Sequence, residues 1–154
     1  YGIAKDSLRK ALFEIRSNKD FELTWARVFY PYGEGQSNQS LYSLIKAAAN
    51  SMAPELMLSN SDSILDFLPV IELSEILTVL TVDFGEVGLV NLGSGRPISV
   101  IDFSRALAKA HNWSVNLRVG SETSRIFESK CFWSDNSKLI EILSEYQTLN
   151  RYLN

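Results

Sequence analysis

Apolar residues recur every three or four positions in several parts of this chain, which is the spacing of one face of an α-helix. In the opening segment, Ala4, Leu8, Leu12 and Ile15 follow this spacing while charged residues occupy the other side. The pattern predicts an amphipathic helix over residues 1–18. Further helices are predicted in the same way over residues 41–52, 72–82 and 100–111, and from residue 135 onward.

Other segments carry the alternating or short apolar patterns of β-strands. Strands are predicted over residues 21–29, 88–92 and 113–119, and a small hairpin is predicted from 56–58 and 64–70. Strands that alternate with helices indicate an α/β fold with some parallel pairing. Only the first two of these strands look fully buried, so the remainder of a doubly wound sheet would have to come from elsewhere.

Composition narrows the class of protein. The 154 residues are 45% hydrophobic and 21% charged, which suits one globular unit. A net charge of −3 without a basic run gives no reason to expect nucleic acid as a partner. The chain has no apolar stretch long enough for a membrane span and does not open with a signal peptide, so we expect a cytoplasmic protein. With one cysteine, Cys131, and one histidine, His111, a metal site is not expected.

Two residues at the start of the first helix could carry chemistry. Tyr1 and Lys5 lie four apart, so their side chains fall on the same helical face. A nearby ammonium stabilises a phenolate, and a phenol tuned in this way can exchange a proton with a substrate hydroxyl. The pair alone is not specific, because a tyrosine and a lysine at this spacing also occur by chance.

Several single residues have ordinary structural explanations. For Arg27, on a predicted strand, a structural ion pair is favoured over a substrate contact. Tyr30 and Tyr32 follow that strand in a loop and could line a pocket or simply pack. His111 is expected at the end of a helix, and Cys131 is expected to be a buried filler. The three tryptophans are expected in the core: Trp25, Trp113 and Trp133.

Five motifs in a fixed order add to the Tyr–Lys pair. They are Tyr-Gly-Ile-Ala-Lys at 1–5, Trp-Ala-Arg-Val-Phe-Tyr-Pro-Tyr-Gly-Glu-Gly-Gln at 25–36, Leu-Asp-Phe-Leu-Pro-Val at 65–70, Val-Asn-Leu-Gly-Ser-Gly at 90–95 and Asp-Asn-Ser-Lys-Leu at 135–139. Together they resemble the second half of the extended short-chain dehydrogenase/reductases, the NAD-dependent epimerase/dehydratase family that acts on nucleotide sugars. The resemblance covers about residues 1 to 143.

The resemblance implies a set of site residues. Tyr1 would be the catalytic acid/base, and Lys5 would tune it and hold the nicotinamide ribose. Phe29, Tyr30 and Pro31 would join Tyr1 and Lys5 in binding NAD or NADP. Substrate would be bound by three residues of the following loop: Tyr30, Tyr32 and Gln36.

The chain also departs from the family pattern. It has no Gly-x-Gly-x-x-Gly loop for the dinucleotide phosphates, so we expect no cofactor bound to this chain alone. The family's catalytic Ser or Thr precedes the tyrosine and is not in this sequence. Many members carry Arg where this chain has Leu65, Asn in place of Tyr30 and Pro in place of Glu34. A leucine cannot pair with a diphosphate, which weakens the nucleotide-sugar assignment more than the oxidoreductase one.

The predicted architecture is therefore the C-terminal part of a Rossmann-like parallel sheet with helices, plus a small α/β substrate-binding part, without the N-terminal glycine-rich half. Residues 1–35 and 72–112 would form the Rossmann-like part, and 36–71 and 113–154 the substrate-binding part, as one unit. The start at Tyr1 suggests a piece of a longer protein. A homo-oligomer or association with the missing half is expected. The alternative is a catalytically silent fragment, or a binding or oligomerisation module.

Overall fold

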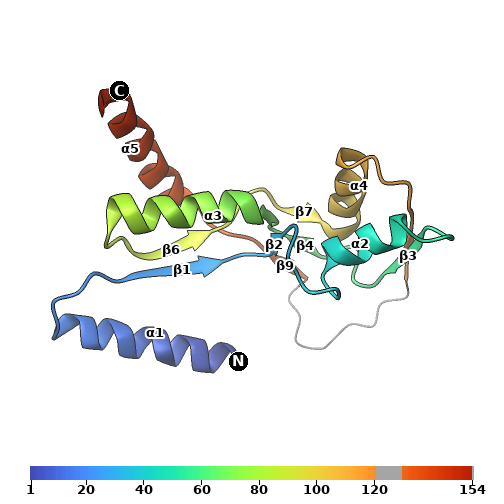
Figure 1. Cartoon of the computed structure of the whole chain (residues 1–154). Coiled ribbons are helices and arrows are strands. Elements are labelled where there is room, and N and C mark those ends of the chain that lie inside the picture. Colours follow the sequence, from blue (N-terminus) through green and yellow to red (C-terminus); the bar gives the residue numbers. More distant parts are fainter. Residues whose placement is uncertain (121–129, 154) are drawn as a thin grey trace.

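The computed structural model describes residues 1–120 and 130–153, with side chains described as far as residue 147. It shows two lobes joined by short strands (Figure 1). The first lobe contains α1 (Gly2–Ser17), β1 (Thr24–Val28), α3 (Val70–Val79), the π-helical turn η1 (Leu80–Phe84), β6 (Gly88–Leu92) and α5 (Ser137–Leu153). The second contains α2 (Leu41–Ala49), β3 (Glu55–Leu58), α4 (Val100–Ala110) and β8 (Asn116–Val119).

The first lobe is built on two parallel strands. β1 pairs with β6, with Thr24 opposite Gly88 and Val28 opposite Leu92. α3, η1 and α5 cover this pair and bury Leu73, Leu80, Leu139 and Ile142 against Val90 and Leu92. Among the described residues β1 pairs with no other strand, so its second edge is open. The parallel pairing confirms the predicted α/β class.

The second lobe is also built on two parallel strands. β3 and β8 pair in parallel, with Glu55 opposite Asn116 and Leu58 opposite Val119. α2 and α4 pack together and bury a second apolar cluster of Tyr42, Ile45, Phe103, Leu107 and Ala108. Ser40 and Ser99 cap the two helices by accepting hydrogen bonds from backbone N–H groups three residues on. With Ser99 as its cap, α4 begins at Val100, where the predicted helix over residues 100–111 begins.

Short strands join the lobes. β2 (Pro31–Tyr32) pairs in parallel with β5 (Leu68–Pro69), and β4 (Ile64–Leu65) lies between β7 (Ile98–Ser99) and β9 (Cys131–Phe132). The predicted hairpin between 56–58 and 64–70 is therefore wrong. Its two halves pair with other segments instead, β3 with β8 and β4 with β7 and β9, because strand register is decided by the whole sheet rather than by the turn between two neighbouring runs.

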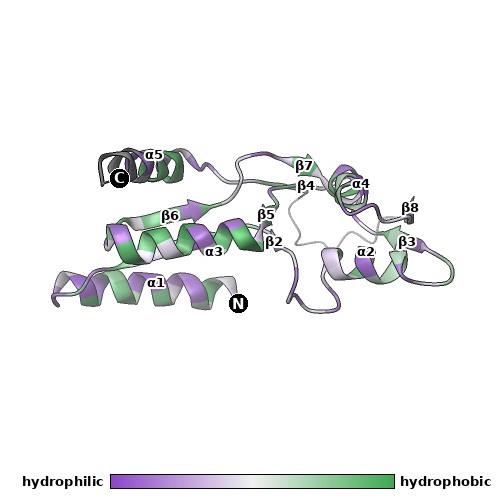
Figure 2. Ribbon diagram, turned by 45° about the horizontal axis from the view of Figure 1, so that its top comes forward, coloured by the Kyte–Doolittle hydropathy of each residue, from purple (hydrophilic) through white to green (hydrophobic). Residues whose placement is uncertain are grey.

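The amphipathic helix predicted over residues 1–18 forms as α1, but most of its apolar residues stay exposed. It lies alongside β1 (Figures 1 and 2), and an ion pair between Arg16 and Glu86 ties its C-terminal end to the turn before β6. Leu12 is half-buried, but Leu8 and Ile15 remain 48% and 49% exposed, and no residue of α1 is fully buried. The apolar side of this helix is thus largely open to solvent in this chain.

The predicted division of the chain into a Rossmann-like and a substrate-binding part remains a prediction. Two helices pack differently from the predicted allocation: α5, assigned to the substrate-binding part, packs in the first cluster, and α4, assigned to the Rossmann-like part, packs in the second. The predicted irregular segment over residues 120–131 falls mostly outside the described residues, apart from its two ends.

Candidate active site

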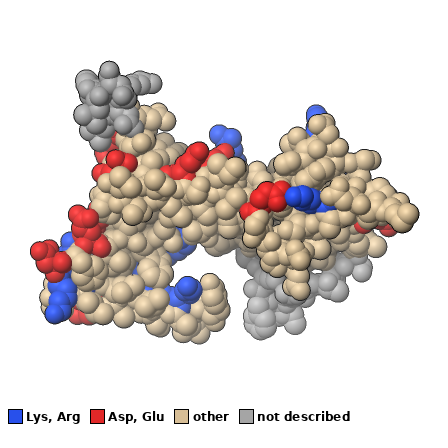
Figure 3. Space-filling view, in the orientation of Figure 1, with Lys and Arg blue, Asp and Glu red and all other residues tan. Residues whose placement is uncertain are grey.

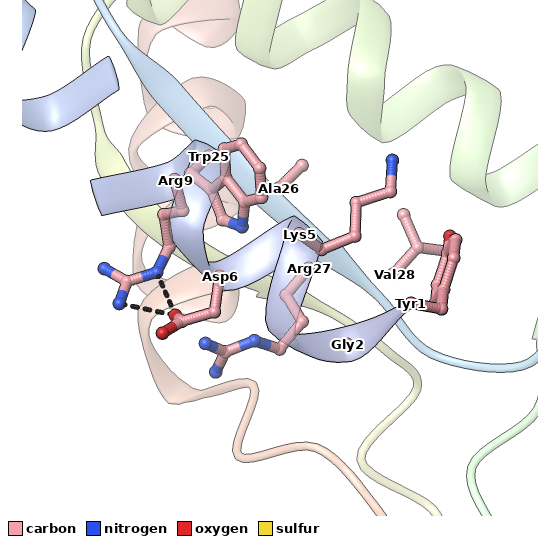
Figure 4. A pocket seen from close by; sticks show the side chains of 9 residues that line it. All are labelled: Tyr1, Gly2, Lys5, Asp6, Arg9, Trp25, Ala26, Arg27 and Val28. Carbon is pink, nitrogen blue, oxygen red and sulfur yellow. Dashed lines mark hydrogen bonds and ion pairs between the residues drawn. The ribbon is translucent and has the colours of Figure 1, made fainter. Parts of the chain in front are cut away.

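Tyr1 and Lys5 meet at the N-terminal end of α1. Tyr1 is the residue that precedes the helix, and its carbonyl accepts the N–H of Lys5 at 3.1 Å, which closes the first helical turn. The spacing of four then brings the Lys5 ammonium to 5.6 Å from the centre of the Tyr1 ring (Figure 4). The Tyr1 side chain is 97% exposed, so solvent or a ligand can reach the phenol freely.

The pair opens onto a cavity between α1 and β1. This cavity has a volume of about 500 Å³. It is lined by Tyr1, Gly2, Lys5, Asp6, Arg9, Trp25, Ala26, Arg27 and Val28. Figure 3 shows basic side chains in the hollow between α1 and the layer above it. The cavity ends at Val28, the last residue of β1, which is the strand end where open α/β sheets bind ligands.

The charges of the cavity are predominantly positive. Three cations line it, Lys5, Arg9 and Arg27, against one carboxylate, Asp6. Asp6 is already engaged, because Lys10 and Arg9 each approach it within 2.8 Å. Their hydrogen bonds lower the pKa of Asp6 to about 2. Asp6 therefore stays anionic and neutralises Arg9, and Lys5 keeps its charge free to act on Tyr1 or on a ligand.

Arg27 is placed differently from the expectation. It is exposed rather than buried, and its hydrogen bond goes from Nη1 to Oδ1 of Asn91 at 3.4 Å. Among the described residues it forms no ion pair within 4 Å, so the structural ion pair favoured from the sequence is wrong. Its position on the cavity wall leaves a guanidinium available for an anion.

The segment after β1 packs into an aromatic cluster. Phe29 is buried, with its ring stacked on Phe132 at 4.9 Å, while Tyr30 is 43% exposed. Tyr32 lies edge-on against Phe103 at 4.8 Å. Burial, and secondarily the charge of Glu72, raises the pKa of Tyr32. Tyr30 is thus placed at the surface and Tyr32 in the packing, whereas the sequence left both roles open for each.

The loop that follows is held by its own side chains. The amide of Gln36 donates to the carbonyl of Pro31 at 2.6 Å and accepts the N–H of Gly33 at 3.3 Å. Glu34 accepts from the Tyr42 hydroxyl at 2.8 Å and from the Lys46 ammonium at 2.6 Å. The Lys46 and Tyr42 hydrogen bonds lower the pKa of Glu34. None of residues 29–36 lines the cavity beside Tyr1, so the two predicted groups of site residues occupy neighbouring but separate places.

Residues in and after β9 were misjudged from the sequence. Cys131 is exposed, although it was expected to be buried. Trp133 is 52% exposed, although it was expected in the core. β9 lies at the edge of its three-stranded sheet. Phe132 also contacts Tyr30 edge-on at 6.3 Å, which extends the aromatic cluster toward the end of β1. The sequence signal for such a strand is the alternation of apolar and polar side chains, and β9 with its two residues is too short to show it.

Other classes of site are not found in the described part of the chain. Residues 1–120 and 130–153 contain no group of three or more His, Cys, Asp or Glu side chains that could hold a metal ion. The helices described there include none long and apolar enough to cross a membrane.

The chain resembles one curated protein in sequence. It is 27% identical over 134 residues to dTDP-6-deoxy-L-talose 4-dehydrogenase (NAD(+)) of Aggregatibacter actinomycetemcomitans, which covers 86% of this chain and 49% of that protein. No family model matches the sequence. The chain thus spans about half the length of the curated relative that it matches.

Solved structures confirm the fold. The UDP-N-acetylglucosamine 4-epimerase of Methanobrevibacter ruminantium, in complex with UDP-N-acetylmuramic acid, superposes with a TM-score of 0.74 at 19% identity, over 92% of this chain and 46% of that one. The UDP-glucose 4-epimerase of Stenotrophomonas maltophila, with bound NAD and formylated UDP-arabinopyranose, gives 0.74 at 18% identity, over 94% and 48%. The fold is that of part of the Rossmann-like epimerases, and the proteins similar to this chain are nicotinamide-dependent enzymes of nucleotide sugars.

Proposed function

We propose that this chain is the C-terminal part of an NAD(P)-dependent enzyme that oxidises, epimerises, dehydrates or reduces a nucleotide sugar. The observation that carries the proposal is the contact between the Lys5 ammonium and the Tyr1 ring, 5.6 Å from its centre, at the mouth of a cationic cavity beside the end of β1. Tyr1 takes the proton of a sugar hydroxyl when the sugar carbon loses a hydride, and returns it in the reverse step. Lys5 stabilises the phenolate that accepts this proton.

The residues present suit one end of the cofactor. When bound, the nicotinamide accepts or donates the hydride. Lys5 and Tyr1 offer polar groups to a ribose hydroxyl, and Tyr30 and Pro31 lie just beyond the end of β1. This sequence contains no glycine-rich loop for the diphosphate. In the proposal, polypeptide that precedes Tyr1 supplies that loop, the upstream Ser or Thr and a strand on the open edge of β1.

The substrate is proposed from the relatives and from charge. The relatives' names include dTDP- and UDP-linked sugars. In this chain, Leu65 cannot pair with a diphosphate, whereas Arg27 presents a guanidinium on the cavity wall. Tyr30, Tyr32 and Gln36 are proposed to shape the sugar side of the site. Because the Gln36 amide already closes its own loop, its contribution is to fix the loop rather than to lend a free amide.

Two variants test the acid/base role in the protein completed by the preceding polypeptide. Tyr1→Phe is expected to reduce turnover by about 10²- to 10⁴-fold, the usual contribution of a general acid/base, while cofactor affinity is kept. Lys5→Ala is expected to reduce both turnover and cofactor affinity. The matched control is Lys19→Ala, which removes an exposed lysine just after the same helix and outside the cavity. Unchanged turnover in Tyr1→Phe would rule out the role.

The alternative is a chain that binds or assembles without catalysis on its own. The open edge of β1 and the exposed apolar residues of α1 favour it, since both invite a partner. Titration of the 154-residue chain with NAD, followed by calorimetry, separates the two ideas. We expect no measurable binding by the chain alone and binding once the preceding half is present. Tight binding by the chain alone would contradict the proposal that the preceding polypeptide supplies the loop for the cofactor diphosphate.

A further inference from the structure

The junction between the lobes is organised around one buried carboxylate, Asp66. Its side chain is fully buried, and it accepts five hydrogen bonds. Ser94 gives its N–H at 2.8 Å and its hydroxyl at 2.5 Å, and Gly95 gives its N–H at 3.1 Å. Ser134 gives its N–H at 3.0 Å and its hydroxyl at 2.5 Å. All these donors are hydroxyls or backbone N–H groups rather than cations.

The partners of Asp66 come from the segments that pass between the lobes. Asp66 itself lies between β4 and β5, Ser94 and Gly95 follow β6, and Ser134 lies between β9 and α5. The segments approach so closely that a side chain at Gly93 would not fit. A Cβ there would lie 2.5 Å from Oδ2 of Asp66. The carboxylate therefore holds together three passages of the chain.

The residues that follow Asp66 contact the segment that comes after β1. Its neighbour Phe67 stacks on Phe103 at 3.7 Å, and the N–H of Leu68 donates to the carbonyl of Tyr30 at 3.2 Å. Further along, Val70 approaches Gly33, where φ is +143° and a Cβ would lie 2.7 Å from Cγ1 of Val70. Residues 66–70 thus form the support on which Tyr30 and its neighbours rest.

We propose that Asp66 is a positioning residue: through its five hydrogen bonds it sets the orientation of the second lobe, and of residues 30–33, relative to the Tyr1–Lys5 pair. The inference rests on the proposed function for the meaning of that orientation, but the orientation itself is a property of the chain. A buried carboxylate without a cation is costly unless every hydrogen bond is made, so the arrangement holds in one geometry only. In the absence of such ties, lobes joined by small interfaces move relative to each other.

The test measures the distance between the lobes in the full chain without any ligand. Spin labels are placed at Glu75→Cys on α3 and Ala106→Cys on α4, both exposed, in a chain carrying Cys131→Ser, and the distance distribution is recorded by pulsed electron paramagnetic resonance. Asp66→Asn keeps the shape but places an amide N–H₂ among donors. We expect it to widen the distribution by about twofold or more, because the lobes lose their tie.

Single-hydroxyl variants keep the test decisive if Asp66→Asn does not fold. Ser134→Ala and Ser94→Ala each remove one donor and leave the backbone donors, and each is expected to widen the distribution to a smaller extent. The control is Asp62→Asn, an exposed carboxylate of the same segment, 3.8 Å from Lys130. It should leave the distribution unchanged.

An unchanged width in the folded Asp66 or serine variants, together with a lower melting temperature, would show that the carboxylate only stabilises the fold and would overturn the proposal. Equal widening in Asp62→Asn would do the same. Because no cofactor or substrate enters the measurement, its failure leaves the role of Tyr1 untouched, and inactivity of Tyr1→Phe says nothing about Asp66.

Discussion

Asp66 makes the stability of the chain depend on pH. Burial acts to raise its pKa, but hydrogen bonds from Ser134, Ser94 and Gly95 outweigh burial and hold the pKa below its ordinary value. A carboxyl whose pKa is lower in the folded state stabilises that state above its unfolded pKa, near 4, and loses the contribution as pH falls through the folded pKa.

Urea unfolding between about pH 3 and pH 7 checks this. The parent chain should lose stability on the acid side, and Asp66→Asn should flatten that slope while losing about 3 kcal/mol or more at neutral pH, as buried charge networks do when broken. Asp135→Asn is the matched comparison: Ser137 also lowers the pKa of Asp135, but Asp135 is exposed and accepts two hydrogen bonds rather than five, so this variant should flatten the slope less. An acid slope that Asp66→Asn leaves intact would contradict the expectation.

Local spacing decides which site residues a sequence can predict. The contact of Tyr1 with Lys5 follows from a separation of four on a helix, so it could be predicted. The Asp66 site could not, because its partners lie 28, 29 and 68 residues further along the chain. The exposure of Cys131 was missed for the same reason, since it depends on which strands flank β9.

The elements show the same division between local and distant interactions. The helices begin and end near their predicted bounds, because caps such as Ser99 and apolar spacing are written in neighbouring residues. The pairing of β3 with β8 and of β4 with β7 and β9 was not predicted, because register between distant strands depends on the whole sheet. The parallel class was still predictable from the alternation of strands and helices.

The cap of α4 gives a prediction at the scale of one element. Ser99 accepts the N–H of Asp102 at 3.1 Å and donates its hydroxyl to the Asp102 carboxylate at 2.6 Å. Ser99→Ala should lower the free energy of unfolding by about 1 kcal/mol. For a domain of this size, we expect the melting temperature to fall by about 2–4 °C. Ser7→Ala, at an exposed position inside α1, is the control and should change stability little; an equal loss there would show that capping is not the cause.

At the scale of the whole molecule, the exposed apolar residues of α1 and the open edge of β1 indicate how the chain assembles. Leu8 and Ile15 are about half exposed, and with Ala4 and Ala11 they form one stripe along α1. Sixteen residues of helix extend about 24 Å, so a stripe about 10 Å wide offers a few hundred Å². A stable interface needs about 800 Å² on each partner. The stripe alone is therefore too small for tight association, and the open edge of β1 would have to contribute.

Sedimentation of the chain over a range of concentrations tests this arithmetic. We expect the apparent mass to rise above 17.3 kDa only at high concentration, because two half-exposed aliphatic side chains contribute a few kcal/mol at most. The double variant Leu8→Lys, Ile15→Lys should abolish that rise, whereas Ser17→Lys, at an exposed position on the opposite side of the same helix, should not. If the preceding half of the protein covers the stripe instead, adding that half suppresses self-association of the parent chain. A chain that remains monomeric at every concentration, and that the added half does not bind, would show that neither the stripe nor the edge of β1 is an interface.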